Sequence, residues 1–329
     1  MKTLLLTDED VRRLLSMKEV IEAVELAFKE KALGRVQMPP KPYIFYRRYN
    51  GDLRVMPSYL EKLDISAVKV VNVHPDNPSK HKLPTVMATI ILVDPKNGAP
   101  IAIMGGTWIT AMRTGAAGGV AAKYLARPDS RVVGIIGAGV QARTQLMALK
   151  EVLKEIEEVR VTDIVKAARE RYAEEMSEKL GLNVKAVDSA KKAVEGADIV
   201  VTVTPSREPI VKSEWIGPGV HINAIGADAP GKEELDPELL KRAKIIVDDV
   251  EQASHSGEIN VPLARGIITE EDIWAELGDV VAGLKPGRTS PSDITIFDST
   301  GLAIQDAVTA ALAYKKALAK GIGQLIEIV

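Results

Sequence analysis

The residues best placed to do chemistry form a glycine-rich turn, Gly137-Ala138-Gly139-Val140-Gln141-Ala142. The mostly β-branched run Val132 to Ile136 precedes the turn and predicts a buried strand, and a helical pattern follows it. In such a GxGxxA turn the first glycine permits a tight bend, the second lets a pyrophosphate approach the backbone, and alanine lets the helix pack on the strand. The first helical amides then face the phosphates. A glycine turn without a ligand is the alternative, but the strand-turn-helix context favours dinucleotide binding.

An acidic residue stands where this fold binds a ribose. Asp163 ends the predicted strand Val159 to Thr162, about 24 residues beyond the turn. A carboxylate there bonds the ribose hydroxyls and repels a 2′-phosphate, which favours NAD over NADP. Capping of the following helix is the alternative role, and the nearby Lys166 and Arg169 leave the strength of the preference open.

Two other residues could move protons. Lys69 lies in the apolar, strand-like run Ala67 to Val73, where desolvation and nearby cations would lower its pKa toward that of a useful base. A strand lysine that faces solvent is the alternative. Asp228 ends another predicted buried strand and could accept a proton or orient water, although it could simply form a turn before Pro230. Lys69 and Asp228 could also titrate as one coupled pair.

Cations that could bind a carboxylate are Lys41, Arg54 and Arg113, and the fork of arginine makes it the stronger bidentate partner. Among the histidines, His221 falls in a predicted core strand and His81 in a lysine-rich loop. His74 and His255 are weaker candidates for lining a site. We find no spacing typical of a metal site and no Ser-His-Asp arrangement.

Composition limits the class of protein. The 329 residues predict about two domains, and 46% hydrophobic content is enough for their cores. A net charge of −2 with interspersed signs gives no footprint for nucleic acid or an anionic membrane, so a small molecule is the expected partner. The chain has no cysteine, which excludes disulfides and thiolate sites. No signal peptide or transmembrane run is visible, and we expect a cytoplasmic protein.

The part of the chain before Arg113 predicts a sheet built from hairpins. Thr7 and Ser16 are expected helix N-caps, and Gly34 ends the second helix. An Asn50-Gly51 turn and further turns separate the strands, so the sheet should be mostly antiparallel. The expected strands are Tyr43 to Arg48, Leu53 to Met56, Ser66 to Asn72, Val86 to Val93 and Pro100 to Met104.

From Thr114 strands alternate with helices, which predicts a doubly wound parallel Rossmann sheet of α/β class. A long helix ending at Lys320 carries an apolar face that includes Leu302, Ile304, Ala307, Val308, Ala311, Leu312 and Leu318. Because this face needs burial, we expect the helix to return to the first domain. The Rossmann domain, residues 114–303, would then be inserted into a smaller α+β domain of residues 1–113 and 304–329. The expected Rossmann strands are Val132 to Ile136, Val159 to Thr162, Val184 to Val187, Ile199 to Thr204, His221 to Ile225, Ile245 to Val247 and Ile294 to Phe297.

Signatures spread over nearly the whole chain resemble those of the ornithine cyclodeaminase and mu-crystallin family, and within it the archaeal alanine dehydrogenases. The resemblance implies a homodimer in which the first domain binds substrate and pairs the subunits. The signatures are MPPK at Met38, DLRVMP at Asp52, VKVVNVHPDNP at Val68, LPTVMA at Leu83, RTGAAGGVAAKYLAR at Arg113, the turn GAGVQA, INAIGADAPGKEELD at Ile222, and FDSTGLAIQD at Phe297.

The same resemblance assigns roles to single residues. Lys69 and Asp228 would be catalytic, in proton transfer around the substrate nitrogen and Cα. Substrate would be bound by Lys41, Arg54, Arg113 and Thr300. Contacts to NAD would come from Thr85, Arg113, Thr114, Gly137, Gly139, Val140, Gln141, Asp163, Thr204, Ile225, Gly226, Ala227, Lys232 and Ser299.

One departure from the family pattern bears on the substrate. Ornithine cyclodeaminases carry a glutamate where this chain has Arg54 before Val55-Met56-Pro57, and a cation there would repel a diamino acid. The resemblance therefore implies NAD-dependent oxidation of L-alanine to pyruvate and ammonium, with no metal. Ornithine cyclodeamination, cyclic ketimine reduction and a non-enzymatic nucleotide-binding role of the mu-crystallin type are the alternatives.

Overall fold

The computed structural model describes residues 2–328, which divide into two compact units. The first unit contains the described residues up to Arg113 together with those from Leu302 onward, and the second contains Thr114–Gly301. The second unit is therefore continuous in sequence and lies between the two segments of the first. The division at Arg113 falls inside one helix, α4 (Thr107–Leu125).

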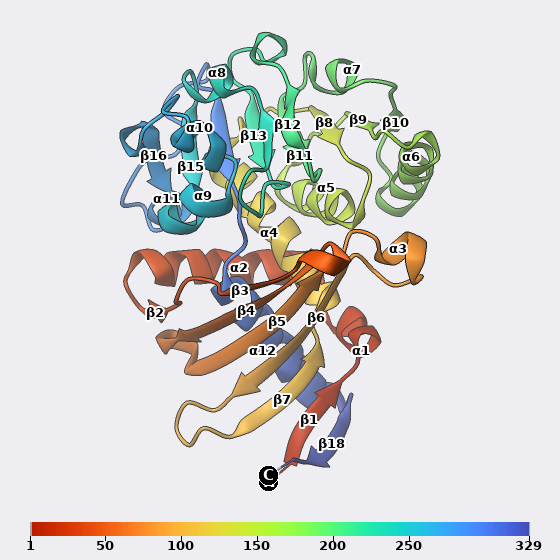
Figure 1. The fold of residues 1–329 in the computed structure, drawn as a ribbon, viewed down its shortest axis with the longest axis vertical. Helices are drawn as coiled ribbons and strands as arrows, with labels where there is room; N and C mark the ends of the chain where they lie inside the picture. Colours follow the sequence, from red (N-terminus) through yellow and green to blue (C-terminus); the bar gives the residue numbers. More distant parts are fainter. Residues whose placement is uncertain (1, 329) are drawn as a thin grey trace. The chain divides into compact units, whose positions relative to one another are not determined.

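The first unit is built on a sheet with the strand order β18-β1-β7-β6-β5-β4-β2, and β3 also pairs with β4 (Figure 1). Every pair in it is antiparallel except β1 with β7, which confirms the mostly antiparallel prediction. The strands are β1 (Lys2–Leu6), β2 (Val36–Gln37), β3 (Tyr43–Tyr46), β4 (Gly51–Leu60), β5 (Ile65–Val73), β6 (Val86–Val93), β7 (Pro100–Gly105) and β18 (Gln324–Glu327).

Some strand boundaries in the first unit differ from the prediction. The strand β3 ends at Tyr46, because a 3-10 turn, η1 (Arg47–Tyr49), leads to Asn50 in the left-handed conformation. The strand β4 does not stop at Met56 but continues through Pro57 to Leu60, paired with β5 along its whole length. The strands β1 and β18 were missed because each is short and pairs only with chain segments that are distant in sequence.

Helix α12 (Ala303–Lys320) belongs to the first unit and packs on β4, β5 and α2, as the predicted return of the chain requires (Figure 1). Its buried face is less apolar than expected, since it includes Gln305 and Asp306, whereas Leu318 is exposed. Thr7 and Ser16 cap α1 (Asp8–Leu14) and α2 (Met17–Ala32) as predicted, and the short α3 (Asn77–Lys80) follows β5.

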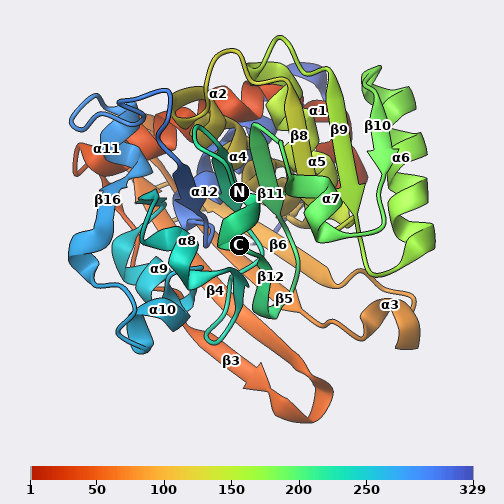
Figure 2. The same ribbon diagram turned by 90° about the horizontal axis from the view of Figure 1, so that it is seen from above.

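The second unit is a wholly parallel sheet with the strand order β10-β9-β8-β11-β13-β17-β15-β16, flanked by helices (Figure 2). This confirms the doubly wound prediction. From β8 the chain moves outward to β9 and β10, and then returns to the other side of β8 with β11. The topological switch point, where such sheets bind their ligands, therefore lies between the carboxyl ends of β8 and β11.

The strands of the second unit are β8 (Val132–Ile136), β9 (Glu158–Thr162), β10 (Val184–Ala186), β11 (Ile199–Thr202), β13 (His221–Ala224), β15 (Lys244–Val247), β16 (Ile273–Glu276) and β17 (Thr295–Asp298), with β12 (Arg207–Val211) and β14 (Glu233–Leu235) paired separately. Its helices are α5 (Val140–Val152), α6 (Lys166–Leu180), α7 (Ala190–Val194), α8 (Pro237–Leu240), α9 (Val250–Ser256), α10 (Asn260–Ala264) and α11 (Leu277–Val281). Asp236 caps α8 and left-handed Gly181 ends α6, as predicted, whereas β12, β14 and β16 were missed.

The glycines of α4 serve close packing within the second unit. A Cβ on Gly115 would lie 2.5 Å from the carbonyl oxygen of Thr144, and one on Gly118 would overlap the side chain of Gln145. Both partners belong to α5, so glycine at these positions lets α4 and α5 pack closely. Within residues 2–328 no helix has the length and apolar character that a membrane span requires.

Candidate active site

A buried ion pair occupies the face of the first unit's sheet against which α12 packs. The Lys69 Nζ lies 2.7 Å from Oδ2 of Asp306, and each side chain is 1% exposed. The other carboxylate oxygen, Oδ1, accepts a hydrogen bond of 3.1 Å from Nε of Arg113. Arg113 also donates from Nη1 to Oε1 of Gln305 at 3.0 Å. Apart from their mutual ion contact, Lys69 Nζ and Asp306 Oδ2 have no hydrogen-bond partner among residues 2–328.

This arrangement shifts the proton affinity of Lys69 strongly. Burial, which disfavours the charged ammonium, and the nearby Arg113 cation together lower the pKa of Lys69 to about 7. The Asp306 carboxylate opposes both effects, and Lys41 adds a smaller repulsion. Lys69 is therefore buried as predicted, and the alternative of a lysine that faces solvent is wrong. Its role as a base stays a prediction.

Local structure explains why these residues meet. Side chains alternate along β4 and β5, so Asp52, Arg54 and Met56 of β4 share the buried face with Lys69 of β5. Asp306 comes from the first turns of α12, which packs on this face. Sequence reasoning did not single out Asp306 or Gln305. The available signal was two polar residues on the face of a helix that must be buried.

Arg54 is already paired. Its Nε and Nη2 donate to the two carboxylate oxygens of Asp52 at 2.9 and 3.0 Å, and its guanidinium lies over the ring of Tyr43. Since Asp52 balances its charge, the argument that Arg54 repels a diamino acid is weakened. The predicted contacts of Arg54 and Lys41 to a substrate carboxylate stay predictions. The charge of Lys41 lowers the pKa of Lys69.

In the second unit the glycine turn has the geometry its sequence predicts. Gly137 has a φ of 102°, and a Cβ there would approach the carbonyl oxygen of Val203 to 3.0 Å. Nothing lies within 4 Å of a Cβ built on Gly139, which is the N-cap of α5. The turn is tied to β9, because Asp163 accepts from the amides of Ala138 (2.9 Å) and Val165 (2.8 Å). Asp163 is thus not the N-cap of α6, which is Val165.

Buried carboxylates hold the strand ends beyond the switch point. Glu234 accepts from the amide and hydroxyl of Thr204, both at 2.7 Å, and from the amide of Gly226 at 2.9 Å. Asp248 accepts from the amide and hydroxyl of Thr300, the predicted substrate ligand, at 2.7 and 3.0 Å. Ser299 lies beside it with a buried hydroxyl that has no hydrogen-bond partner among the described residues. These acidic side chains escaped sequence reasoning, although Glu234 lies in one of the signatures.

Two further carboxylates extend this network. Glu258 accepts from the amides of Glu234 (2.8 Å) and Leu235 (2.6 Å), and Asp298 accepts from the amide of Ile259 at 3.1 Å. Burial raises the pKa of Glu258 well above its usual value, and the neighbouring Glu234 charge adds to this. Burial also raises the pKa of Asp298 to about 8, with a contribution from Asp248. Hydrogen bonds from backbone amides favour the charged carboxylates and oppose this rise.

Asp228 has a partner other than the predicted one. It forms an ion pair with Lys232 at 2.5 Å, four residues later, while Lys69 is paired with Asp306. Each predicted catalytic residue therefore has its own oppositely charged neighbour.

The other predicted ligands lie in helices and in the loops beside strands. Thr85 accepts from the amide of His74 through its carbonyl, and Thr114 likewise from the Gln145 side chain. Val140 is exposed, Gln141 contacts the Thr144 hydroxyl, and Ile225 and Ala227 are buried.

Histidines contribute little to this chemistry. His221 is fully buried between Thr295 and Asn223, and burial lowers its pKa to about 3, so its interpretation as a core residue is confirmed. Among residues 2–328 no cluster of histidine and acidic side chains could hold a metal ion.

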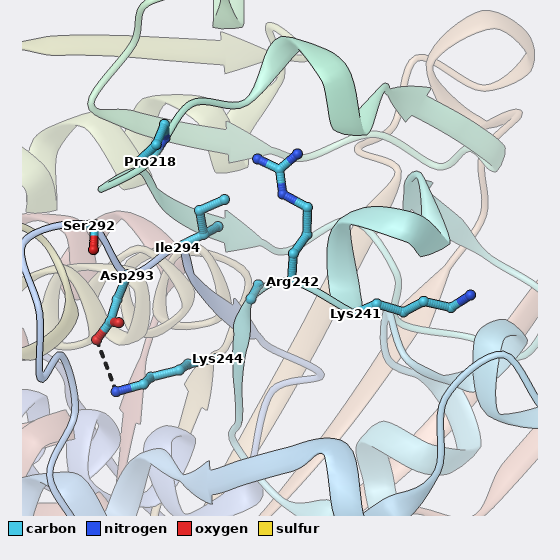
Figure 3. A pocket seen from close by; sticks show the side chains of 8 residues that line it. Pro218, Lys241, Arg242, Lys244, Ser292, Asp293 and Ile294 are labelled. Carbon is cyan, nitrogen blue, oxygen red and sulfur yellow. Dashed lines mark ion pairs between the residues drawn. The ribbon is translucent and has the colours of Figure 1, made fainter.

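A surface cavity of about 510 Å³ is lined by Lys241, Arg242, Lys244 and Asp293 (Figure 3). Its cations are engaged: Lys241 with Glu238, Lys244 with Asp293, and Arg242 with the carbonyl of Ile216. The cavity lies at the amino ends of β15 and β17, whereas ligands of a parallel sheet bind at the carboxyl ends. We therefore do not assign it to the active site.

Comparisons with known proteins show which family the chain belongs to. The model of the "Ornithine cyclodeaminase/mu-crystallin family" matches residues 1–321. An alanine dehydrogenase of Archaeoglobus fulgidus is 51% identical over 99% of both chains. An archaeal alanine dehydrogenase dimer solved with bound NAD has 51% identity and a TM-score of 0.96, covering 100% of both chains. A Δ1-pyrroline-2-carboxylate reductase of Thermococcus litoralis, solved with NADH and L-proline, has 50% identity and a TM-score of 0.96 over 98% of this chain and 100% of the other.

Proposed function

Since the chain belongs to the ornithine cyclodeaminase/mu-crystallin family, we propose that it is an NAD-dependent oxidoreductase that interconverts L-alanine with pyruvate and ammonium. The observation that carries this proposal is the fully buried Lys69, whose pKa is lowered to about 7 beside Asp306 and Arg113. A general base is most effective when its pKa lies near the working pH.

The proposed reaction uses Lys69 as the proton acceptor. Neutral Lys69 takes a proton from the ammonium of alanine, which frees the nitrogen lone pair. Bound NAD would accept the hydride from Cα, and this oxidation would leave the substrate as an iminium. Water adds to the iminium, and loss of ammonium gives pyruvate. We assign Asp228 to the orientation of this water.

Substrate binding falls to the cations of the first unit. Arg113 and Lys41 both act electrostatically on Lys69, and their charges would attract the alanine carboxylate to the same place. Arg54 would add a contact while it stays paired with Asp52. Thr300, fixed by Asp248, would contribute a hydroxyl.

NAD would bind at the switch point of the second unit and supply the hydride acceptor. Gly137 permits the tight turn, Gly139 would leave room for the pyrophosphate beside the first amides of α5, and Asp163 would offer its carboxylate to the ribose. Thr204, Gly226 and Ser299 stand at the ends of β11, β13 and β17 and would contact the nicotinamide half. The further contacts predicted from the family signatures belong to the same proposal.

A second candidate is reduction of a cyclic imine, and the Thermococcus litoralis reductase, at 50% identity, favours it. An imine that already contains the C=N bond needs hydride and one proton, and protonated Lys69 could supply that proton. The same residues therefore suit both substrates, and only turnover can separate them.

The deciding experiment compares four substrate pairs with one enzyme preparation. The protein is incubated with NAD and L-alanine, with NAD and L-ornithine, with NADH plus pyruvate and ammonium, and with NADH plus Δ1-pyrroline-2-carboxylate. Alanine-dependent NADH formation with matching reverse activity supports the proposal. A kcat/KM at least about 100-fold higher for the cyclic imine would replace it with the second candidate.

Two other outcomes point elsewhere. Ammonium released from ornithine without net NADH would identify a cyclodeaminase. Nucleotide binding without any turnover would favour the non-enzymatic role. Lys69→Ala serves as the inactive control in every arm.

We also propose that the protein is a homodimer paired through the first unit. Large apolar side chains on and after β3, namely Ile44, Phe45 and Tyr49, are more than half exposed, at 56%, 55% and 63%. A second copy would remove them from water. Light scattering after gel filtration tests this, and a mass of one 35.5 kDa chain would refute it.

A further inference from the structure

We propose that Glu234 is a positioning residue for the nicotinamide half of the cofactor, because one buried carboxylate joins the ends of β11 and β13. The proposal rests on the proposed binding of NAD, but on no particular substrate. Glu234 is fully buried in the short strand β14, and its two oxygens accept from different loops. Oε1 binds the amide and hydroxyl of Thr204, and Oε2 binds the amide of Gly226.

The two loops that Glu234 joins are in close contact. A Cβ on Gly226 would lie 2.1 Å from the carbonyl oxygen of Thr204 and 2.5 Å from Oε2 of Glu234. The Thr204 loop in turn approaches the glycine turn, because a Cβ on Gly137 would lie 3.0 Å from the Val203 carbonyl oxygen. Glu234 therefore fixes the strand ends that border the switch point on the side away from β9.

Glu234 is itself held in place. The Glu258 carboxylate accepts its backbone amide at 2.8 Å and that of Leu235 at 2.6 Å. Burial raises the pKa of Glu234, and the hydrogen bonds from Thr204 and Gly226 oppose that shift by favouring the carboxylate. Burying a carboxylate costs free energy, and the hydrogen bonds from the two loops offset this cost.

An isosteric change separates the function of this bridge from its volume. In Glu234→Gln only one side-chain oxygen remains, so the amide NH2 must face either the Thr204 or the Gly226 amide, which are both donors. One loop then loses its anchor. Glu234→Asp keeps the charge, but its side chain is one methylene shorter and cannot reach both loops.

The test compares binding of NADH with binding of ADP-ribose, which has the adenosine, the pyrophosphate and the second ribose but no nicotinamide. In a doubly wound sheet the adenosine half lies over β8 and β9, and the nicotinamide half lies over the other half of the sheet. We expect Glu234→Gln to weaken NADH binding at least about tenfold and to leave ADP-ribose binding within about twofold. Glu234→Asp should act in the same direction.

The matched control is Glu233→Gln. Glu233 is the preceding residue of β14, is 2% exposed and is paired with Arg265 at 3.3 Å. We expect this control to bind both ligands like the wild type, even if its melting temperature falls.

The possible outcomes separate the two proposals. Equal weakening of both ligands in Glu234→Gln and Glu234→Asp, or no weakening, would overturn the positioning role. Failure of the wild type to bind NADH and ADP-ribose would instead overturn the proposed cofactor. Binding of both ligands without alanine turnover would contradict only the proposed substrate.

Discussion

Removing the Asp306 carboxylate should change the pH at which the enzyme becomes active. In the oxidation of alanine the neutral amine of Lys69 is the active form, so kcat/KM should rise with pH through the pKa of Lys69, about 7. Asp306 stabilises the protonated form from 2.7 Å. In Asp306→Asn this stabilisation is lost and Arg113 keeps its repulsion, so the ascending limb should move to lower pH.

The size of the shift follows from the distance. At an effective dielectric constant of about 20, unit charges 2.7 Å apart attract by about 6 kcal/mol, which is an upper limit equal to about 4 pKa units. Neighbouring charges usually shift a pKa by about 1 to 3 units. The ascending limb of Asp306→Asn should therefore lie at a pH of about 4 to 6.

The assay is a pH profile of kcat/KM for alanine from pH 4 to 9, measured on protein whose fold is checked by its melting temperature. A 13C NMR titration of the Lys69 ε-carbon gives the same pKa without turnover. Asp52→Asn is the matched control, because Asp52 shares the sheet face but is paired with Arg54. A limb that stays near pH 7 in Asp306→Asn would show that Lys69 and Asp306 do not act together.

Three more predictions concern the two units separately. Lys69→Ala and Asp228→Ala should each lower kcat at least about 100-fold and leave the Kd of NADH within about twofold. The control Lys96→Ala, at an exposed lysine, should change neither quantity. Wild-type turnover in Lys69→Ala or Asp228→Ala would exclude the substituted residue from the mechanism. Asp163→Ala should weaken NADH binding and reduce the preference over NADPH in a titration with both, and an unchanged ratio would contradict the ribose contact. The pKa of Asp298 is about 8 in the folded state, above its ordinary value of 3.8, so between these pH values the folded state binds a proton that the unfolded state has lost. The free energy of unfolding should therefore fall as the pH rises from about 4 to 8. Asp298→Asn should reduce this fall by up to about 1.4 kcal/mol per pH unit in denaturant titrations, and an identical slope would refute the assignment.

The parallel sheet was predictable because its central strands are short, strongly apolar and β-branched. Strand β8 and the glycine turn together define one local conformation, and the neighbouring strands repeat the pattern. Strand β14 was not predictable, because the residues Glu233-Glu234-Leu235 have low strand propensity. It exists because β12 pairs with it and because Glu258 binds its amides, and both partners are distant in sequence.

The candidate site was predictable only in part for the same reason. The apolar, strand-like run around Lys69 favoured a buried lysine, but such a run does not identify the partner of the lysine. Coupling to Asp228 was one possibility, and the ion-pair partner in the structure is Asp306, which is brought close by the packing of α12. Partners of buried charges depend on tertiary contacts, and periodicity alone does not contain them.

Charge balance distinguishes the two buried clusters. In the second unit the carboxylates of Glu234, Glu258 and Asp248 accept hydrogen bonds from backbone amides, which favour their charged forms. In the first unit the single negative charge of Asp306 faces two positive charges, those of Arg113 and protonated Lys69. This buried cluster therefore carries an excess positive charge. A buried excess of charge is costly until a counterion arrives. A substrate carboxylate would balance that excess and raise the pKa of Lys69, so Lys69 would become a stronger base once substrate is bound.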